Sequence, residues 1–271
     1  MMTVTIYQFS GTGNTWFVAH HLKRAFTNNG VVCNIVSIEN TESLQEITMT
    51  DDIIGIGYPI YGSDIPEPVL RFFDKIKMHA KQRAFVYCTQ FMYSGDGAAY
   101  GAKKLRKKGF IVHQLAHFNM PNNITDYKIV RWIKPKNVSK LEDTVIKQTK
   151  QLVKAVLDNT PKRKGDHLLG LLLGLVQRVP FQYGKIAYQN SLKIDSTCIL
   201  CMRCVRLCPS QNLKHNNKNI ETLSRCCLCY RCVNHCPVQA IHFTKKTRVK
   251  TPYLGPTDHF DIENVRKYEN Q

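Results

Sequence analysis

The sequence predicts an α/β protein, in which a parallel sheet is covered by helices on both faces and is followed by a small cysteine-rich unit. Two observations predict this organisation. Apolar runs typical of buried strands alternate with helical patterns over residues 3–118, which is the pattern of successive βαβ units. Residues 198–237 then hold nine of the eleven cysteines. Eight of these nine form two copies of one spacing pattern.

The sheet is expected to contain five strands, at residues 3–9, 31–38, 52–58, 84–89 and 110–118. Helical patterns lie between them at residues 16–26, 68–77 and 97–108, and a further helix is expected over residues 139–158. Cys33 and Cys88 fall inside expected strands, where we interpret them as small buried hydrophobic residues.

The loop after the first strand, residues 10–15, has the sequence SGTGNT. A strand, a loop of glycine and hydroxyl residues and a helix form an anion site, because backbone amides and the helix N-terminus face the ligand. A nucleoside-triphosphate loop would need a lysine that is missing here, and a dinucleotide loop would need a third glycine where this chain has Trp16. A plain strand-to-helix turn remains the alternative.

The 10–15 loop resembles the FMN phosphate loop of flavodoxins. That resemblance implies phosphate contacts from Ser10, Thr12, Gly13, Asn14 and Thr15. The order of strands and loops is also similar to that of flavodoxins, which implies a flavodoxin-like five-stranded parallel sheet over residues 1–160.

In flavodoxins the loops after the third and fourth strands flank the isoalloxazine ring. The resemblance therefore implies ring-side contacts from Pro59, Tyr61, Gly62, Gln90, Tyr93, Ser94, Gly95 and Asp96. Tyr61 or Tyr93 is the candidate stacking aromatic, with an exposed loop tyrosine as the alternative for each. Gly62 is the candidate for a peptide that turns with the redox state of the flavin.

Each cysteine run reads C-x2-C-x2-C-x3-C-P, and every member of the second lies 28 positions after its counterpart, so the runs form an internal repeat. This spacing is typical of 4Fe-4S sites, in which the cysteine before proline binds the cluster of the other run. One predicted ligand set is therefore Cys198, Cys201, Cys204 and Cys236, and the other is Cys226, Cys229, Cys232 and Cys208. A disulfide framework and a pair of zinc sites are the alternatives. Cys227 is expected to be a neighbour that binds no iron.

Residues 193–245 resemble a bacterial-type two-cluster ferredoxin, which implies a small α+β domain. The whole chain resembles the flavodoxin-ferredoxin fusion proteins of anaerobic bacteria and archaea. This implies an FMN, two 4Fe-4S clusters and electron transfer between them in an oxygen-free cytoplasm. An electron carrier is favoured over an enzyme. The two alternatives are a flavin-dependent reductase of an organic substrate that is fed by the clusters, and an interaction protein with structural clusters.

The connector, residues 161–192, contains an apolar run at residues 167–179 with Gly170 and Gly174 four positions apart. It is too short to span a bilayer. We expect a helix buried between the domains, with an interfacial helix in peripheral membrane contact as the alternative. The basic tail, residues 246–271, is expected either to wrap back over a domain or to stay mobile.

The chain has 271 residues and a formal net charge of +18. Such a charge favours an acidic redox partner. Binding of nucleic acid is not expected, because no motif of a nucleic-acid-binding fold accompanies the basic residues. The chain opens directly in a strand, so we expect no targeting segment and a cytoplasmic location. Oligomeric state is not indicated.

Overall fold

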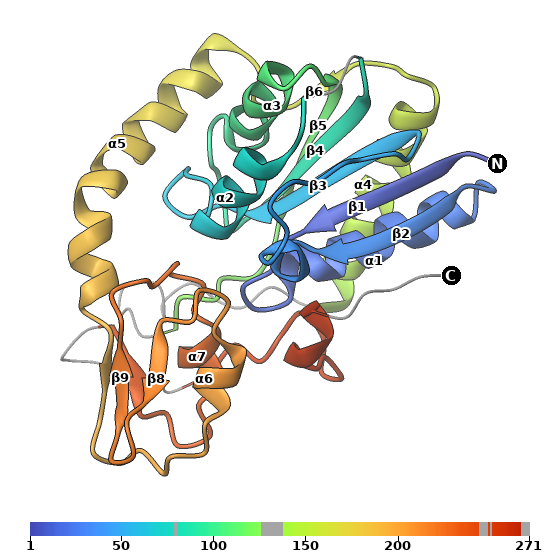
Figure 1. Ribbon diagram of the computed structural model, residues 1–271. Helices are drawn as coiled ribbons and strands as arrows, with labels where there is room; N and C mark the ends of the chain where they lie inside the picture. Colours follow the sequence, from blue (N-terminus) through green and yellow to red (C-terminus); the bar gives the residue numbers. More distant parts are fainter. Residues whose placement is uncertain (79–80, 126–137, 244–248, 250, 267–271) are drawn as a thin grey trace.

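The computed structural model describes residues 1–78, 81–125, 138–243, 249 and 251–266. Figure 1 shows a twisted sheet with its helices above a smaller domain, and one long helix that joins them along the side. The smaller domain lies beneath the carboxyl ends of the sheet strands, so the two predicted cofactor regions face each other.

The sheet has six strands, and every neighbouring pair is parallel. Across the sheet the strands are β2 (Val32–Ser37), β1 (Thr3–Gln8), β3 (Ile53–Pro59), β4 (Arg83–Gln90), β5 (Ile111–Asn119) and β6 (Lys162–Arg163). The first five follow the order 2-1-3-4-5 of the flavodoxin-like arrangement, in which ligands bind outside the carboxyl ends of the strands where the chain reverses direction across the sheet.

β3 is the central strand and is buried on both faces, as expected for a parallel sheet between two helical layers. Its glycines make room for aromatic side chains of β4. A Cβ atom at Gly55 would lie 2.5 Å from the ring of Phe85, and one at Gly57 would lie 2.1 Å from the ring of Tyr87. A larger residue at either position would require the neighbouring aromatic ring to move.

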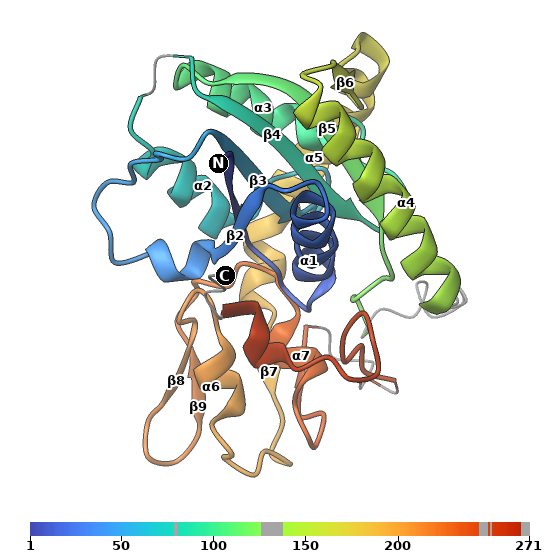
Figure 2. The same cartoon turned by 90° about the vertical axis from the view of Figure 1, so that its right-hand side faces the viewer.

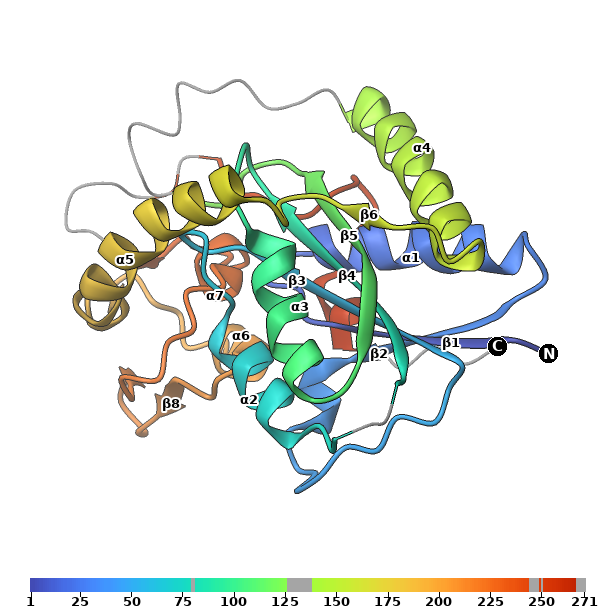
Figure 3. The same cartoon turned by 90° about the horizontal axis from the view of Figure 1, so that it is seen from above.

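Two helices cover each face of the sheet (Figure 3). α1 (Asn14–Thr27) and α4 (Val138–Leu157) share one apolar core with the sheet, and α2 (Glu67–Lys75) and α3 (Gly97–Lys107) share the other. Pro66 caps α2 and Pro68 lies in its first turn, where proline suits a helix start. The predicted α/β class and the five predicted strands are confirmed, with strand boundaries shifted by at most one residue.

The predicted count of five strands is wrong, because β6 pairs with β5 as a sixth strand. β6 has only two residues, and both are basic, so no apolar run marks it in the sequence. Cys33 and Cys88 are fully buried in β2 and β4, as expected, and burial raises the pKa of each thiol to about 12.

The smaller domain has two antiparallel strand pairs and two short helices. These are β7 (Lys193–Ile194) with β10 (Ile241–His242), β8 (Leu213–His215) with β9 (Ile220–Thr222), α6 (Arg203–Leu207) and α7 (Arg231–Asn234). The backbone shows the same 28-residue repeat as the sequence. Met202 and Tyr230, which lie 28 positions apart, both cap a helix in the left-handed conformation, with φ values of 59° and 60°. The two cysteine runs therefore fold in the same way.

The joining helix, α5 (Leu168–Asn190), continues through Pro180 and is much longer than the apolar run from which it was expected. The expectation that it is buried between the domains is wrong. Its leucines face outward, and only Gly170, Gly174 and Arg178 are buried. None of the helices in the described part of the chain is long and apolar enough to cross a membrane.

The described part of the tail wraps back over the molecule. The 3-10 helix η3 (Ile262–Arg266) packs Ile262 and Val265 against Leu207, between the sheet and the smaller domain (Figure 2). The Gln8 side chain donates a hydrogen bond of 3.1 Å to the carbonyl of Val265, so the end of β1 is covered by the tail.

Candidate functional site

A pocket of about 750 Å³, including its open mouth, lies at the carboxyl ends of the central strands. We call it the strand-end cavity. From the sheet domain it is lined by the 10–15 loop and by the loops after β3, β4 and β5. Its remaining wall comes from outside the sheet domain and consists of Phe181, Tyr188, Leu228 and Tyr230.

Eight residues predicted to touch the flavin line this cavity, namely Ser10, Thr12, Asn14, Thr15, Pro59, Tyr61, Gly62 and Gln90. Residues 120–124, which follow β5, line it as well, so the loops after four strands meet at one place. None of the lining residues is a lysine or an arginine. An anion bound here would therefore be held by backbone amides, hydroxyl groups and the N-terminus of α1.

The 10–15 loop is held in shape by its own hydroxyl groups. Gly13 takes a left-handed conformation with φ of 100°, and its amide donates a 3.1 Å hydrogen bond to the Ser10 hydroxyl. The Thr15 and Thr89 hydroxyls lie 2.8 Å apart, and Thr12 accepts a hydrogen bond from the Asn123 side chain. Gly13 itself does not line the cavity, because it supports the turn from behind.

Tyr61 lies where the sheet domain meets the smaller domain. Its hydroxyl is buried and has no hydrogen-bond partner among the described residues. Burial raises the pKa of Tyr61 well above its ordinary value, and the nearby thiols of Cys229 and Cys227 act in the same direction. The Tyr61 side chain thus lines the strand-end cavity while its hydroxyl lies beside Gly11 and the second cysteine run.

The loop after β4 leaves the cavity beyond Phe91, contrary to the expectation for Tyr93, Ser94, Gly95 and Asp96. Tyr93 is 48% exposed, and the Ser94 hydroxyl donates to the Gln90 side chain. Gly95 packs against α5, and Asp96 forms a buried ion pair with Arg178. These four residues thus position α5. The aromatic residues that reach the cavity in their place are Phe91, Phe181, Tyr188 and Tyr230.

The eight repeated cysteines surround two further cavities in the smaller domain. The first cysteine cavity is lined by Cys198, Cys201, Cys204 and Cys236, and the second by Cys208, Cys226, Cys229 and Cys232. Each cavity therefore takes three cysteines from one run and the cysteine before proline from the other. None of the eleven cysteines forms a disulfide.

The two cysteine cavities offer a donor set that fits an iron-sulfur cluster. Backbone amides already point at sulfur atoms at equivalent places in the repeat: Asn212 donates to Cys208 and Ala240 to Cys236, each at 3.2 Å. Burial raises the pKa of Cys204 to about 11 and that of Cys226 to about 12, so their thiolates would need a cation beside them.

The described residues contain no group of three or more side chains placed to hold a single metal ion. In a cluster each thiolate binds a different iron, so its four sulfur atoms stand farther apart than the ligands of one ion. Cys227 lines the second cysteine cavity beside the four repeated cysteines. Its thiol donates a hydrogen bond to Cys229 and lowers the pKa of that thiol to about 7.

The second cysteine run touches the 10–15 loop directly. A Cβ atom at Gly11 would lie 2.7 Å from the carbonyl oxygen of Cys229. Leu228 and Tyr230, on either side of Cys229, line the strand-end cavity. The wall between this cavity and the second cysteine cavity is therefore a single stretch of chain, residues 228–230.

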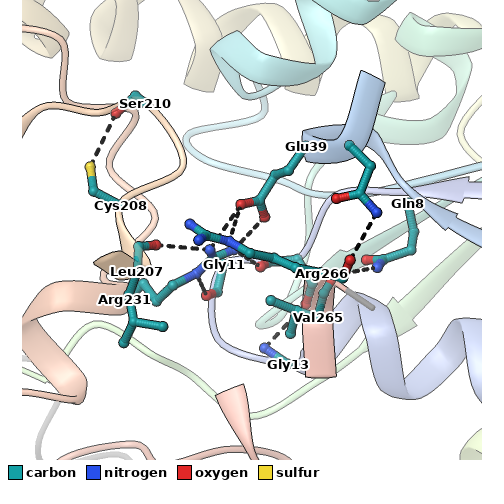
Figure 4. Close-up of polar contacts among 12 residues, drawn as sticks. Gln8, Gly11, Gly13, Glu39, Leu207, Cys208, Ser210, Arg231, Val265 and Arg266 are labelled. Atoms are coloured by element: carbon teal, nitrogen blue, oxygen red, sulfur yellow. Dashed lines mark hydrogen bonds and ion pairs between the residues drawn. The ribbon is translucent and has the colours of Figure 1, made fainter. Parts of the chain in front are cut away.

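Arg231 fastens the two domains together at this wall and is fully buried (Figure 4). Its guanidinium donates to the carbonyl oxygens of Ser10 at 2.8 Å, Gly11 at 3.0 Å and Leu207 at 2.9 Å. Two further hydrogen bonds, of 2.6 and 3.0 Å, go to the carboxylate of Glu39. All five N–H donors of the side chain are thus used.

The tail closes the outer side of the 10–15 loop. The Tyr253 hydroxyl donates to the side chain of Asn14, and Pro256 and Phe260 pack so tightly on Gly13 that a Cβ there would come within 2.7 Å of each. Neither this cover nor the roles of Arg231 and Glu39 are visible in the sequence, because every contact joins residues far apart in the chain.

No protein-family model matches the chain, and no curated protein matches it. Among solved structures, a flavodoxin from the domain Archaea is 16% identical, with a TM-score of 0.40, over 58% of this chain and 99% of its own. The oxidised flavodoxin 1 of Bacillus cereus is 18% identical, with a TM-score of 0.40, over 57% of this chain and 98% of its own. Independently of these two matches, the strand order 2-1-3-4-5 of the sheet is that of the flavodoxin-like arrangement.

Proposed function

We propose that the protein is an electron-transfer iron-sulfur flavoprotein, with FMN in the strand-end cavity and a 4Fe-4S cluster in each cysteine cavity. FMN would accept one or two electrons and each cluster one, so one chain would join one-electron and two-electron chemistry. The observation that carries this proposal is the shared wall at residues 228–230, which separates the second cysteine cavity from the strand-end cavity.

The residues around the strand-end cavity divide by task. The hydroxyls and amides of the 10–15 loop would hold the phosphate, and the N-terminus of α1 adds a favourable dipole. Pro59, Tyr61, Gly62 and Gln90 would flank the ring on the sheet side. Phe181, Tyr188 and Tyr230 would exclude water on the other side, because they close the cavity with large apolar surfaces.

The positions of the cavities suggest an order for the relay. Cys201 in the first cysteine cavity is exposed, and its neighbour Ile199 is 60% exposed, so this end is open to a partner. Cys229 in the second cysteine cavity is buried beside the 10–15 loop. The first cluster would thus exchange electrons with a partner protein, and the second would exchange them with the flavin. The net charge of +18 supports an acidic partner.

The wall that α5 and the second cysteine run add to the strand-end cavity favours an electron carrier over a reductase of organic substrates. Four side chains from α5 and the second cysteine run form a wall where a substrate would otherwise approach the ring. A purely structural role for the clusters is favoured less, because the second cysteine run would then have no reason to form the wall of the cavity.

The test is rapid anaerobic reduction followed by absorbance, which resolves flavin from clusters. In the protein with both cofactor types, electrons delivered to the clusters should reach the flavin at a rate independent of protein concentration. In Cys226→Ala, which removes a ligand of the second cluster, flavin reduction should slow strongly while FMN stays bound.

The matched control is Cys88→Ala, because Cys88 is also fully buried but lies in β4 of the sheet. This variant should transfer electrons as the parent protein does. Equal rates of flavin reduction in the parent protein and Cys226→Ala would overturn the relay.

A further inference from the structure

The outer face of α5 is apolar from end to end. Ten large apolar or aromatic side chains of this helix are exposed, namely Leu168, Leu169, Leu171, Leu172, Leu173, Leu175, Val176, Val179, Tyr183 and Ile186. Residues 168–186 span about 28 Å of helix. The helix contains no aspartate or glutamate. A continuous exposed strip of this kind is characteristic of a binding surface and not of an ordinary solvated helix.

The inner face of the same helix holds its orientation fixed. Gly95 packs against Gly170 and Gly174, and an added Cβ at Gly95 would lie 2.4 Å from the amide nitrogen of Gly174. Such close approach leaves no room for the helix to rotate.

Polar side chains add to this attachment. Arg178 donates to the carbonyl oxygen of Ser63, pairs with Asp96 and stacks 3.8 Å from the ring centroid of Tyr100. The Gln177 side chain accepts a 2.8 Å hydrogen bond from Ser63. Arg178 and Gln177 are therefore bonded to the sheet domain while the leucines of α5 face outward, which is the reverse of an ordinary surface helix. Turning the leucines inward would break a buried ion pair.

Charge distinguishes between the surfaces that could cover this face. Arg163 and Lys164 are exposed just before the helix, and Lys193 is exposed just after it. A second copy of the chain would bring two molecules of net charge +18 together, and their repulsion opposes such a dimer. An anionic membrane attracts the same charges.

We propose that α5 is a membrane-docking helix that lies flat in the interface of an anionic lipid bilayer. Its leucines enter the boundary between headgroups and acyl chains, the basic residues at its two ends meet anionic headgroups, and Tyr183, which is 86% exposed, lies at headgroup level. The contact is peripheral. It requires neither the flavin nor the clusters, so it stands apart from the proposed electron transfer.

The test is flotation of the full-length, cofactor-loaded protein with vesicles of equimolar phosphatidylglycerol and phosphatidylcholine at low ionic strength. The matched variants are Leu172→Glu on α5 and Leu44→Glu in the loop after η1 (Ile38–Thr41). The two leucines are 51% and 47% exposed, and each substitution adds one negative charge. Neither leucine belongs to a buried core.

We expect the parent protein and Leu44→Glu to float with these vesicles, and the parent protein to remain behind with pure phosphatidylcholine. Leu172→Glu should lower the partition coefficient by about tenfold or more, because it places a negative charge where an apolar side chain would enter the boundary between headgroups and acyl chains. Failure of the parent protein to float would overturn the proposal. Equal flotation of Leu172→Glu, or a stable dimer that Leu172→Glu converts to monomer without any lipid binding, would overturn it as well.

Discussion

Arg231 is the side chain on which the joint between the two domains most depends. A buried guanidinium is costly unless every donor finds an acceptor, and here the acceptors come from three separate parts of the chain. Glu39, which faces it, also accepts a 2.8 Å hydrogen bond from Arg266 of the tail. The Glu39 carboxylate therefore ties α7 to the tail, and Arg231 ties α7 to the 10–15 loop.

Replacing Arg231 with methionine should cost about 3 kcal/mol of unfolding free energy, because it leaves the carbonyl oxygens and much of the Glu39 charge without their partner. The measurement is chemical unfolding under anaerobic conditions. The control is Arg203→Met, 28 positions earlier in the repeat, where the side chain is only half-buried and the cost should stay below about 1 kcal/mol. An equal loss of unfolding free energy in the two variants would show that Arg231 does not hold the two domains together.

The crossing cysteines make a second prediction at this scale. Cys208→Ala should remove the same cluster signal in low-temperature electron paramagnetic resonance as Cys226→Ala, because both side chains line the second cysteine cavity. Cys236→Ala should remove the signal that is missing in Cys198→Ala. If Cys208→Ala matched Cys198→Ala instead, each run would hold its own cluster and the crossed assignment would be wrong.

The place of a single residue at a site was predictable from the sequence where the residue belongs to a short local motif. The 10–15 loop and the repeated cysteines have this property, and they line the cavities expected of them, apart from Gly13. Arg231 was not predictable, because the repeat makes it equivalent to Arg203. Only the contact of the second run with the 10–15 loop distinguishes the two arginines.

At the scale of elements, the packing of α5 against the sheet domain depends on glycines, because the missing side chain leaves room for a neighbouring residue. A Cβ at Gly174 would lie 1.9 Å from the carboxylate of Asp96, which is already held by Arg178, whereas a Cβ at Gly184 would meet nothing within 4 Å. The two positions lie on one helix and differ only in what they face.

Gly174→Ala should weaken docking of α5 by about 1–3 kcal/mol and raise hydrogen exchange of its backbone amides accordingly. Gly184→Ala should slow exchange, because alanine stabilises a helix by about 1 kcal/mol over glycine. Mass-resolved hydrogen exchange of both variants measures this. Faster exchange in Gly184→Ala than in Gly174→Ala would contradict the packing described here.

The sequence revealed the glycine spacing of α5 but not the direction in which the helix faces. With leucines on nearly every side, periodicity does not identify a buried face, and burial was the natural expectation. The buried Arg178 sets the direction, and its acceptors lie in loops more than 80 residues away. β6 was not predicted for a simpler reason, because two basic residues do not show the apolar pattern of a buried strand.

At the scale of the whole molecule, the sheet order and the 28-residue repeat were both implied by local patterns, but the placement of one domain on the other was not. Their contact is made by backbone atoms, by side chains such as Arg231 and Asn234 and by a tail with no periodicity. The formal charge of +18 acts at this scale as well.

Reduction by a small anionic reductant should therefore slow as ionic strength rises, because salt screens the attraction to a cationic protein. A cationic viologen should show the opposite trend. Stopped-flow rates over a salt series measure both, and identical salt dependence for the two reagents would show that net charge does not guide the encounter.

Cofactor content tests the central claim most directly. Iron, acid-labile sulfide and FMN should be quantified in protein purified without oxygen and reconstituted with iron, sulfide and FMN. Two clusters and one flavin predict about eight irons, about eight sulfides and one FMN per chain. Zinc in place of iron, or no flavin retained after incubation with FMN, would contradict an iron-sulfur flavoprotein.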